Sequence, residues 1–291
     1  MTISNFYQSG RLGLSFELFP PKTDKGVATL FAQLPNLMKF SPDYVTCTYG
    51  AGGSTRGKTL EILARVKSEF HIPVASHLTV VGSTVDELKH YLKTASQQGI
   101  DYIVALRGDP PAGDDCFEPV AGGLSYANEL VELIRDQFPG VGMAVAGYPE
   151  KHREAVSMAV DLDNLKRKVD AGADVIITQL FYENDDFYRF RDLCADRGIT
   201  IPIVPGILPV VSLAQIQRIA QLCDAKLPKG FSRDLEMASG DAEQLKVGID
   251  FAIQQVADLI KQEACGLHFY VLNKSKSTAK VLEAINDQND R

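Results

Sequence analysis

The sequence predicts an α/β fold, an eight-stranded parallel (β/α)8 (TIM) barrel with a helical insertion before the eighth strand. Short apolar runs alternate with segments of helical periodicity along the whole chain of 291 residues. The runs are continuously apolar rather than alternating, as in parallel strands with helices on one side and a core on the other. Polar residues gather where these runs end, which is where such barrels build their sites.

The expected strands and helices follow each other in strict order. Strands are expected at 14–19, 43–49, 74–79, 102–107, 142–148, 175–182, 201–208 and 266–273. Helices are expected at 25–39, 55–70, 84–98, 123–138, 161–171, 185–198, 212–224 and 277–287. The segment 225–264 holds a short polar stretch and a long helix, and we interpret it as an insertion. A doubly wound sheet shows the same alternation, but eight right-handed units of roughly 30 residues favour a closed barrel.

Composition and spacing describe an ordinary globular chain. No linker or internal repeat divides residues 1–291, so we expect a single domain. The net charge of −7 argues against nucleic-acid binding. Five cysteines without paired spacing argue against a disulfide framework and a zinc site. The chain shows neither a signal segment nor the ~18 apolar residues of a membrane span, so we expect a cytoplasmic protein without a membrane partner.

A polar residue lies near the end of most of the apolar runs. A polar side chain in an apolar strand loses hydration unless a partner or ligand replaces it. Because the carboxyl ends of barrel strands meet at one rim, these side chains should be neighbours. They are Glu17, Thr48, His77, Arg107, Asp109, Tyr148 and Gln179.

Glu17 is the candidate acid of this rim. It lies between Phe16 and Leu18, and an apolar setting is expected to raise the pKa of a carboxyl group and prepare it to donate a proton. The alternative is a structural carboxylate that pairs with Lys22 or with another strand.

A phosphate-loop pattern follows the second strand. Gly52, Gly57, Lys58 and Thr59 satisfy GxxxxGK[ST], which taken alone indicates a nucleotidase. No later strand ends in an evident Mg²⁺-binding Asp, and an eight-unit barrel is the wrong scaffold for that chemistry. We therefore interpret these glycines as a loop that lets backbone approach a ligand.

Two further groups of charged residues have both a functional and a structural interpretation. Arg107 and Asp109 could bind an anion and a heterocycle, or they could form a surface ion pair. On the helix expected at 161–171, four polar residues share one face, which is either a binding face or a solvated one. They are Asp161, Asn164, Arg167 and Lys168. His77 and His152 lack a third ligand at a persuasive spacing, so no metal site is expected.

Together, these strings resemble the methylenetetrahydrofolate reductase family in its short bacterial flavoprotein form, over nearly the whole chain. The strings are SFELFPPK, TYGAGGSTR, SHLT, VALRGDPP, GYPEKH, DLDNLKRKVDAGAD, ITQLFY, PGILPV and HFYVLN. The resemblance implies a barrel with bound FAD, which takes a hydride from NADH or NADPH and passes it to 5,10-methylenetetrahydrofolate. The product would be 5-methyltetrahydrofolate, in the one-carbon metabolism that leads to methionine.

The resemblance also implies roles for individual residues. Glu17 would be the general acid, Asp109 a catalytic carboxylate at the pterin ring and the flavin, Gln179 a substrate contact and Thr48 a nicotinamide contact. Flavin contacts would be Tyr49, Ala51, His77, Arg107, Gly108, Asp109, Ala127, Tyr148, His152, Ala155, Asp161, Asn164, Arg167 and Lys168.

At two positions proposed to contact substrate, the residue differs from the one that the family has. Gln215 and Lys274 match further substrate contacts, but Lys274 stands where the family has Arg and cannot form the same bidentate fork. Ile219 stands where an aromatic residue can stack on substrate. The family also implies a homo-oligomer. Two other classes remain open, a flavin-free barrel lyase or pterin-binding methyltransferase, and a nucleotide-switch protein built on Lys58.

Overall fold

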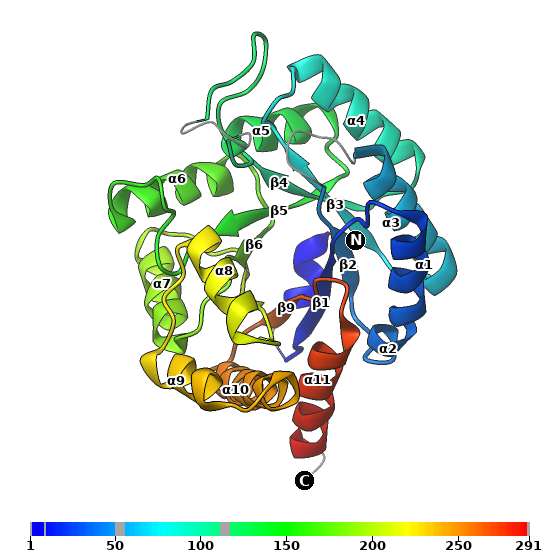
Figure 1. Cartoon of the computed structure of the whole chain (residues 1–291). Helices are drawn as coiled ribbons and strands as arrows, with labels where there is room; N and C mark the ends of the chain where they lie inside the picture. The colour runs from blue at the N-terminus through cyan, green and yellow to red at the C-terminus, as the bar shows by residue number, and fades with distance from the viewer. Residues whose placement is uncertain (1, 9, 50–55, 111–116, 290–291) are drawn as a thin grey trace.

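The computed structural model describes residues 2–8, 10–49, 56–110 and 117–289, whose strands form one parallel sheet. The strand order is β7-β6-β5-β4-β3-β2-β1-β9-β8 (Figure 1). The strands are β1 (Gly13–Leu18), β2 (Tyr44–Cys47), β3 (Val74–Thr79), β4 (Tyr102–Leu106), β5 (Gly142–Gly147), β6 (Val175–Thr178), β7 (Ile203–Val204), β8 (Gly206–Ile207) and β9 (Gly266–Tyr270).

The sheet closes into a barrel through an interrupted strand. β7 pairs with β6, β8 pairs with β9, and only Pro205 separates β7 from β8. Proline has no N–H to donate to a ladder, which interrupts the single strand expected at 201–208. The carbonyl of Pro205 still accepts a hydrogen bond from the His268 N–H at 3.0 Å. The expected eight-unit barrel is therefore confirmed, with its seventh strand in two pieces.

Helices surround the barrel (Figure 1). They are α1 (Asp24–Gln33), α2 (Pro35–Met38), α3 (Arg56–Phe70), α4 (Val85–Gln97), α5 (Ala127–Gln137), α6 (Met158–Asp170), α7 (Asn184–Asp196), α8 (Leu213–Cys223), α9 (Lys229–Met237), α10 (Asp241–Lys261) and α11 (Ser275–Asn289). The helix expected at 25–39 is broken at Pro35, because proline cannot continue the hydrogen-bond ladder. The expected insertion at 225–264 contains two helices, α9 and α10. The stretch that the sequence analysis described only as polar therefore forms α9.

The barrel interior is arranged in layers that the strand register defines. Ser15 of β1 lies opposite Tyr44 of β2 and His268 of β9, and all three are fully buried. Glu17, two residues further along β1, lies opposite Thr46 and Tyr270. Because residues two apart on a strand share a face, this polar layer lies directly above the Ser15 layer.

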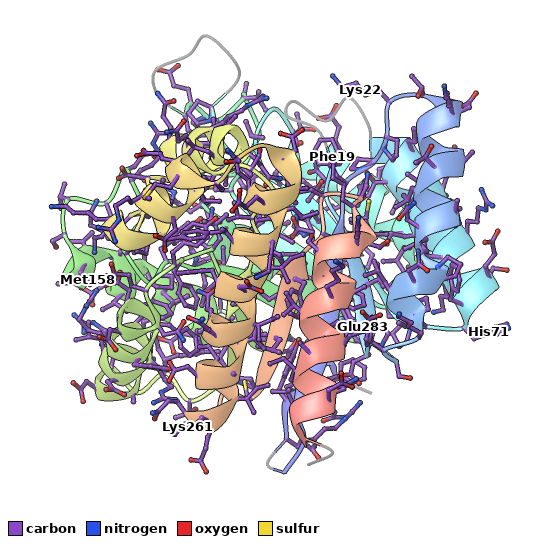
Figure 2. All side chains as sticks on the ribbon, turned by 60° about the horizontal axis from the view of Figure 1, so that its bottom comes forward. Phe19, Lys22, His71, Met158, Lys261 and Glu283 are labelled. Atoms are coloured by element: carbon purple, nitrogen blue, oxygen red, sulfur yellow. The ribbon has the colours of Figure 1, made fainter. Side chains whose placement is uncertain are left out.

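A short 3₁₀ helix, η1 (Ile3–Tyr7), fills the amino-terminal end of the barrel. Its Ile3, Phe6 and Tyr7 are buried in a cluster with Tyr44 and Tyr102. The opposite end carries the loops that follow the strands, and Figure 2 shows Phe19 and Lys22 near that rim, with Lys261 near the other end. Within the described ranges, no helix has the length and apolar character that crossing a membrane requires.

Candidate active site at the carboxyl end of the barrel

Two adjoining cavities open at the carboxyl ends of the strands. The inner cavity, about 390 Å³, lies over the barrel mouth and is lined by Glu17, His77, Asp109, Gln179 and Tyr270 among others. The outer cavity, about 290 Å³, lies between the β4 and β5 ends and α6. Both are lined by Leu106, Arg107, Ala146, Tyr148 and His152. An elongated ligand could therefore occupy both.

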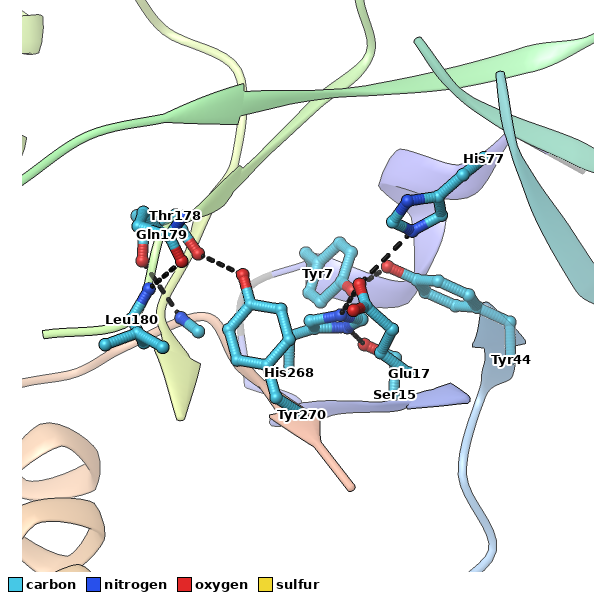
Figure 3. Close-up of polar contacts among 11 residues, drawn as sticks. Tyr7, Ser15, Glu17, Tyr44, His77, Thr178, Gln179, Leu180, His268 and Tyr270 are labelled. Atoms are coloured by element: carbon cyan, nitrogen blue, oxygen red, sulfur yellow. Dashed lines mark hydrogen bonds and ion pairs between the residues drawn. The ribbon is translucent and has the colours of Figure 1, made fainter. Parts of the chain in front are cut away.

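Glu17 lies between two imidazoles in the inner cavity (Figure 3). Its Oε2 is 3.2 Å from Nε2 of His77 and 3.5 Å from Nε2 of His268. Each contact is an ion pair only when its imidazole is protonated, and neither Nε2 atom has a hydrogen bond of good geometry. The Glu17 side chain is 17% exposed and faces the cavity, whereas His268 is completely buried. The carboxylate is thus reachable by a ligand from one side only.

The raised pKa expected for Glu17 is wrong. Burial does act to raise the pKa of this carboxyl, but the two adjacent imidazoles, His77 foremost, outweigh it and lower the pKa to about 2. The sequence showed only the apolar neighbours on β1, whereas both histidines come from other strands. No ion pair joins Glu17 to Lys22 in the described residues.

The remaining lining of the inner cavity combines polar groups with an apolar wall. Gln179 follows β6, and its Oε1 accepts a hydrogen bond from the Leu180 N–H at 2.9 Å. The Tyr270 hydroxyl donates to the Thr178 carbonyl at 2.7 Å. Asp109 is exposed at the mouth. The wall is formed by Ile219, Leu222 and Leu272.

A glycine lets β4 turn sharply into the site. Gly108 has φ +89°, and a Cβ there would lie 2.6 Å from Cγ1 of Val81. Any other residue would be strained and would clash, so this position requires glycine. The turn places Arg107 and Asp109 on the cavity lining.

Arg107 pairs with Glu154 rather than with Asp109. Its two terminal nitrogens donate to the Glu154 carboxylate at 2.6 and 2.7 Å, a bidentate fork. This pair holds the pKa of Glu154 below its ordinary value and raises that of Arg107. Glu154 lines the outer cavity and was missed from the sequence, because its partner lies on a different strand unit.

Helix α6 presents its polar face to the outer cavity, where Asp161, Asn164, Arg167 and Lys168 all lie. The Lys168 ammonium donates to the Ala146 carbonyl at 2.6 Å, and burial lowers its pKa to about 8, with Asp161 opposing. The Asp161 carboxylate accepts a hydrogen bond from the backbone N–H of His152 at 2.8 Å. The face therefore lines the cavity, with Asp161 buried and with Asn164 and Arg167 exposed to solvent.

An apolar lip at the outer cavity escaped the sequence analysis. Tyr126, Val156 and Val160 line it together with the predicted Ala127 and Ala155. The side chains of Tyr126 and Val156 are 61% and 87% exposed, which is unusual for such residues.

Four predicted residues lie outside both cavities, and Ala51 lies outside the described residues. The Tyr49 hydroxyl is hydrogen-bonded to Thr79, and the hydroxyl of Thr48 is buried without a hydrogen-bond partner. Gln215 accepts the Val211 N–H at 3.0 Å within the turn before α8, and Lys274 is exposed beyond β9. Their predicted ligand contacts remain predictions.

The phosphate-loop interpretation finds little support in the residues that can be described. Gly57, Lys58 and Thr59 lie in α3, and the Thr59 hydroxyl donates to the Thr48 carbonyl at 2.9 Å. This hydroxyl is therefore already used to anchor the helix, and Lys58 lies 3.7 Å from Asp24. Within the described ranges, no three His, Cys, Asp or Glu side chains are grouped as metal ligands would be.

The closed parallel barrel with its site at the carboxyl ends places this chain among the TIM-barrel proteins. It superposes on an uncharacterized protein from Clostridium thermocellum that binds two copies of 5-methyl-5,6,7,8-tetrahydrofolic acid, with a TM-score of 0.62, 14% identity and 96% of each chain covered. Dihydropteroate synthase from Xanthomonas albilineans, in complex with 7,8-dihydropteroate, superposes with a TM-score of 0.54, 12% identity and coverage of 96% and 94%. Such low identities establish the fold alone.

Sequence comparison is more specific. A family model described as methylenetetrahydrofolate reductase matches residues 2–286. Methylenetetrahydrofolate reductase (NADH) 1 of Arabidopsis thaliana is 39% identical over 291 residues, which cover 96% of this chain and 49% of the relative. The 5,10-methylenetetrahydrofolate reductase of Escherichia coli K12 is 37% identical over 277 residues, covering 95% and 91%. This chain belongs to the methylenetetrahydrofolate reductase family of oxidoreductases, although it spans only about half the length of the plant relatives.

Proposed function

We propose that this protein reduces 5,10-methylenetetrahydrofolate to 5-methyltetrahydrofolate with electrons from NADH or NADPH, passed through a bound FAD. The observation that carries the proposal is the pair of adjoining cavities, one with a buried acid and one with a basic face, at the rim where such barrels react. Family membership names the substrate class, and the plant relatives name NADH.

The outer cavity suits the adenine, ribose and pyrophosphate parts of a dinucleotide such as FAD, whose flavin ring would extend into the inner cavity. Arg167, Lys168 and Asn164 offer cationic and amide donors suited to a pyrophosphate and a ribose, and the apolar lip suits an adenine ring. The shared lining of Arg107, Tyr148 and His152 leads from there to the inner cavity. FAD, when bound, would supply the hydride chemistry that these side chains lack.

The inner cavity would then receive the nicotinamide and the pterin in turn, a ping-pong sequence. We propose that Glu17 protonates the folate nitrogen whose release opens the five-membered ring, giving the iminium that accepts hydride. Substrate binding would complete the burial of Glu17, which acts to raise the carboxyl pKa. Asp109 and Gln179 are proposed to hold the pterin edge.

His268 is proposed to position Glu17. Its Nδ1 lies 2.8 Å from the Ser15 hydroxyl, and its Nε2 faces Glu17, so the imidazole bridges Ser15 and the acid (Figure 3). His77 borders Glu17 from β3 and lines the cavity where the flavin ring would lie. The carboxylate thus has a fixed orientation before substrate arrives.

The decisive experiment is an anaerobic titration of purified protein reconstituted with FAD. We expect bound flavin to be bleached by NADH or NADPH and reoxidised by methylenetetrahydrofolate, with 5-methyltetrahydrofolate as the product. Titration with each nicotinamide separately gives the preference. A protein that binds no FAD would contradict the proposal and favour the flavin-free lyase or methyltransferase class. Sedimentation of the same sample tests the predicted homo-oligomer.

A further inference from the structure

A row of buried hydroxyl and imidazole groups crosses the barrel interior below Glu17. In the sheet register Tyr44, Ser15 and His268 are successive partners on β2, β1 and β9. Their side chains are all buried, and Ser15 Oγ lies 2.8 Å from Nδ1 of His268. The row is therefore a lateral connection between three strands, one layer beneath the candidate acid.

Tyr7 extends this row to the amino-terminal end of the barrel. It comes from η1, and its hydroxyl lies 2.6 Å from that of Tyr44 in a buried phenol pair (Figure 3). Burial raises the pKa of both phenols, while hydrogen bonding to Ser15 acts in the opposite direction. Other ionisable groups near the pair are Asp43 and Cys265. Both phenols therefore keep their protons.

The phenol pair has one hydroxyl proton that is not used in the bond between the two rings. Two phenols carry two protons, and the bond between them uses only one. The second is available to Ser15 Oγ, the hydroxyl that adjoins Tyr44 in the register. A serine oxygen that accepts this proton can donate its own hydrogen to an imidazole nitrogen, and the other imidazole nitrogen then carries the ring proton.

We propose that Tyr7 and Tyr44 are positioning residues that set the tautomer of His268: the phenol pair donates one hydrogen bond to Ser15, Ser15 donates to Nδ1, and the Nε2–H of His268 faces the Glu17 carboxylate. The inference rests on the proposed function for its catalytic consequence, but the tautomer itself does not depend on it. Through Tyr7, η1 not only fills the amino-terminal end of the barrel but also helps to orient the acid.

The surroundings of Glu17 give the sign of the effect. The groups that face it are His77 from β3, His268 and Tyr270 from β9, and Cys47 from β2. Either phenol alone still has a proton for Ser15, because both hydrogen-bond to it. Loss of both phenols frees Ser15 Oγ to accept from Nδ1–H, and Nε2 then presents a lone pair to Glu17. That change removes a donor from the ionised form, so the carboxyl should protonate at higher pH.

The first test reads the tautomer directly by ¹⁵N NMR of histidine-labelled protein, with the His268 signals assigned by their loss in His268→Gln. We expect the Nε2–H form in the wild type and a shift toward Nδ1–H in the double variant Tyr7→Phe/Tyr44→Phe, which leaves no phenol proton for Ser15. Tyr188→Phe is the control, since it removes a 2.6 Å hydroxyl bond to Asp258 outside the barrel. An Nδ1–H wild type, or a double variant with an unchanged spectrum, would overturn the inference.

The second test separates the two half-reactions by stopped flow. In the double variant Tyr7→Phe/Tyr44→Phe the folate half-reaction should slow by about three- to tenfold, as for loss of one hydrogen bond, and its acid limb should move to higher pH. Flavin reduction by NAD(P)H should match that of Tyr188→Phe. Equal slowing of both half-reactions would indicate a purely structural role. Should no variant, wild type included, reduce folate, the proposed function fails while the NMR result still decides the tautomer.

Discussion

At the scale of single residues, the environment of Glu17 reverses the simplest expectation for a buried carboxyl. Its lowered pKa means that the stability contributed by the ionised carboxylate is full above the ordinary value of 4.5 and is lost as pH falls toward about 2. The resting acid is therefore ionised, and protonation has to be coupled to ligand binding. Both imidazoles are close enough to act on the carboxylate directly, because each Nε2 lies within 3.5 Å of Glu17 Oε2.

Glu17→Gln should keep flavin reduction by NAD(P)H and slow folate reduction by on the order of 100-fold or more, because general acid catalysis typically contributes that much. Rapid-mixing kinetics of each half-reaction measures this. The free energy of unfolding of Glu17→Gln should lie below that of the wild type at neutral pH. The difference should shrink as the pH falls below about 4.5. Glu283→Gln, which loses an exposed pair with Lys39, serves as control. Equal loss of both half-reactions would reject the acid role.

Lys168 should make FAD affinity depend on pH. Burial lowers its pKa to about 8, and an anionic ligand requires the protonated form. Affinity should be level below about pH 8 and fall by about tenfold per unit above it. Calorimetric titration with FAD across this range tests the prediction. Lys168→Met should bind weakly at every pH, whereas Lys166→Met, which loses only an exposed pair with Asp170, should keep the wild-type profile. A flat wild-type curve would contradict this assignment.

At the scale of elements, the orientation of α6 decides the outer cavity. Its N-cap is Ser157, whose hydroxyl accepts the Val160 N–H at 3.3 Å. Ser157→Ala should cost about 1 kcal/mol of local stability and weaken FAD binding by up to about fivefold. Thr23→Ala removes the equivalent cap of α1, whose residues line neither cavity, and should leave FAD affinity unchanged. Flavin fluorescence quenching compares them, and equal weakening by both would argue against a local effect.

The sequence analysis succeeded where a signal is local to one element and failed where contacts between elements decide. The alternation of runs predicted the barrel, and the spacing on α6 predicted that four polar residues share one face. Only the family resemblance implied that this face contacts a ligand. Proline at 205 and 35 divided elements whose apolar patterns run through them. The Arg107–Glu154 fork and the His268–Glu17 contact join segments that are distant in the sequence, so no local pattern predicts them. The role of η1 likewise depends on a layer that only closure creates.

At the scale of the whole molecule, η1 should dominate stability out of proportion to its length. Phe6 stacks on Tyr44 with ring centroids 5.7 Å apart and is 6% exposed. Phe6→Ala should destabilise the fold by roughly 3–5 kcal/mol, since it opens a cavity at the barrel end. Denaturant unfolding measures this, with Met237→Ala as an exposed control expected to change little. A cost below about 1 kcal/mol would show that the plug is dispensable.

The pairing of β1 with β9 also has a consequence for biosynthesis. The Gly13 N–H donates to the Cys265 carbonyl at 3.0 Å, so the first strand finds one of its two neighbours only when the last strand is made. At ~5–20 residues per second, a ribosome needs roughly 10–50 s to make the intervening chain. Throughout that interval the nascent β1 has an open edge able to pair with other chains. Efficient production in the cell should therefore depend on chaperones that shield this edge until translation reaches β9.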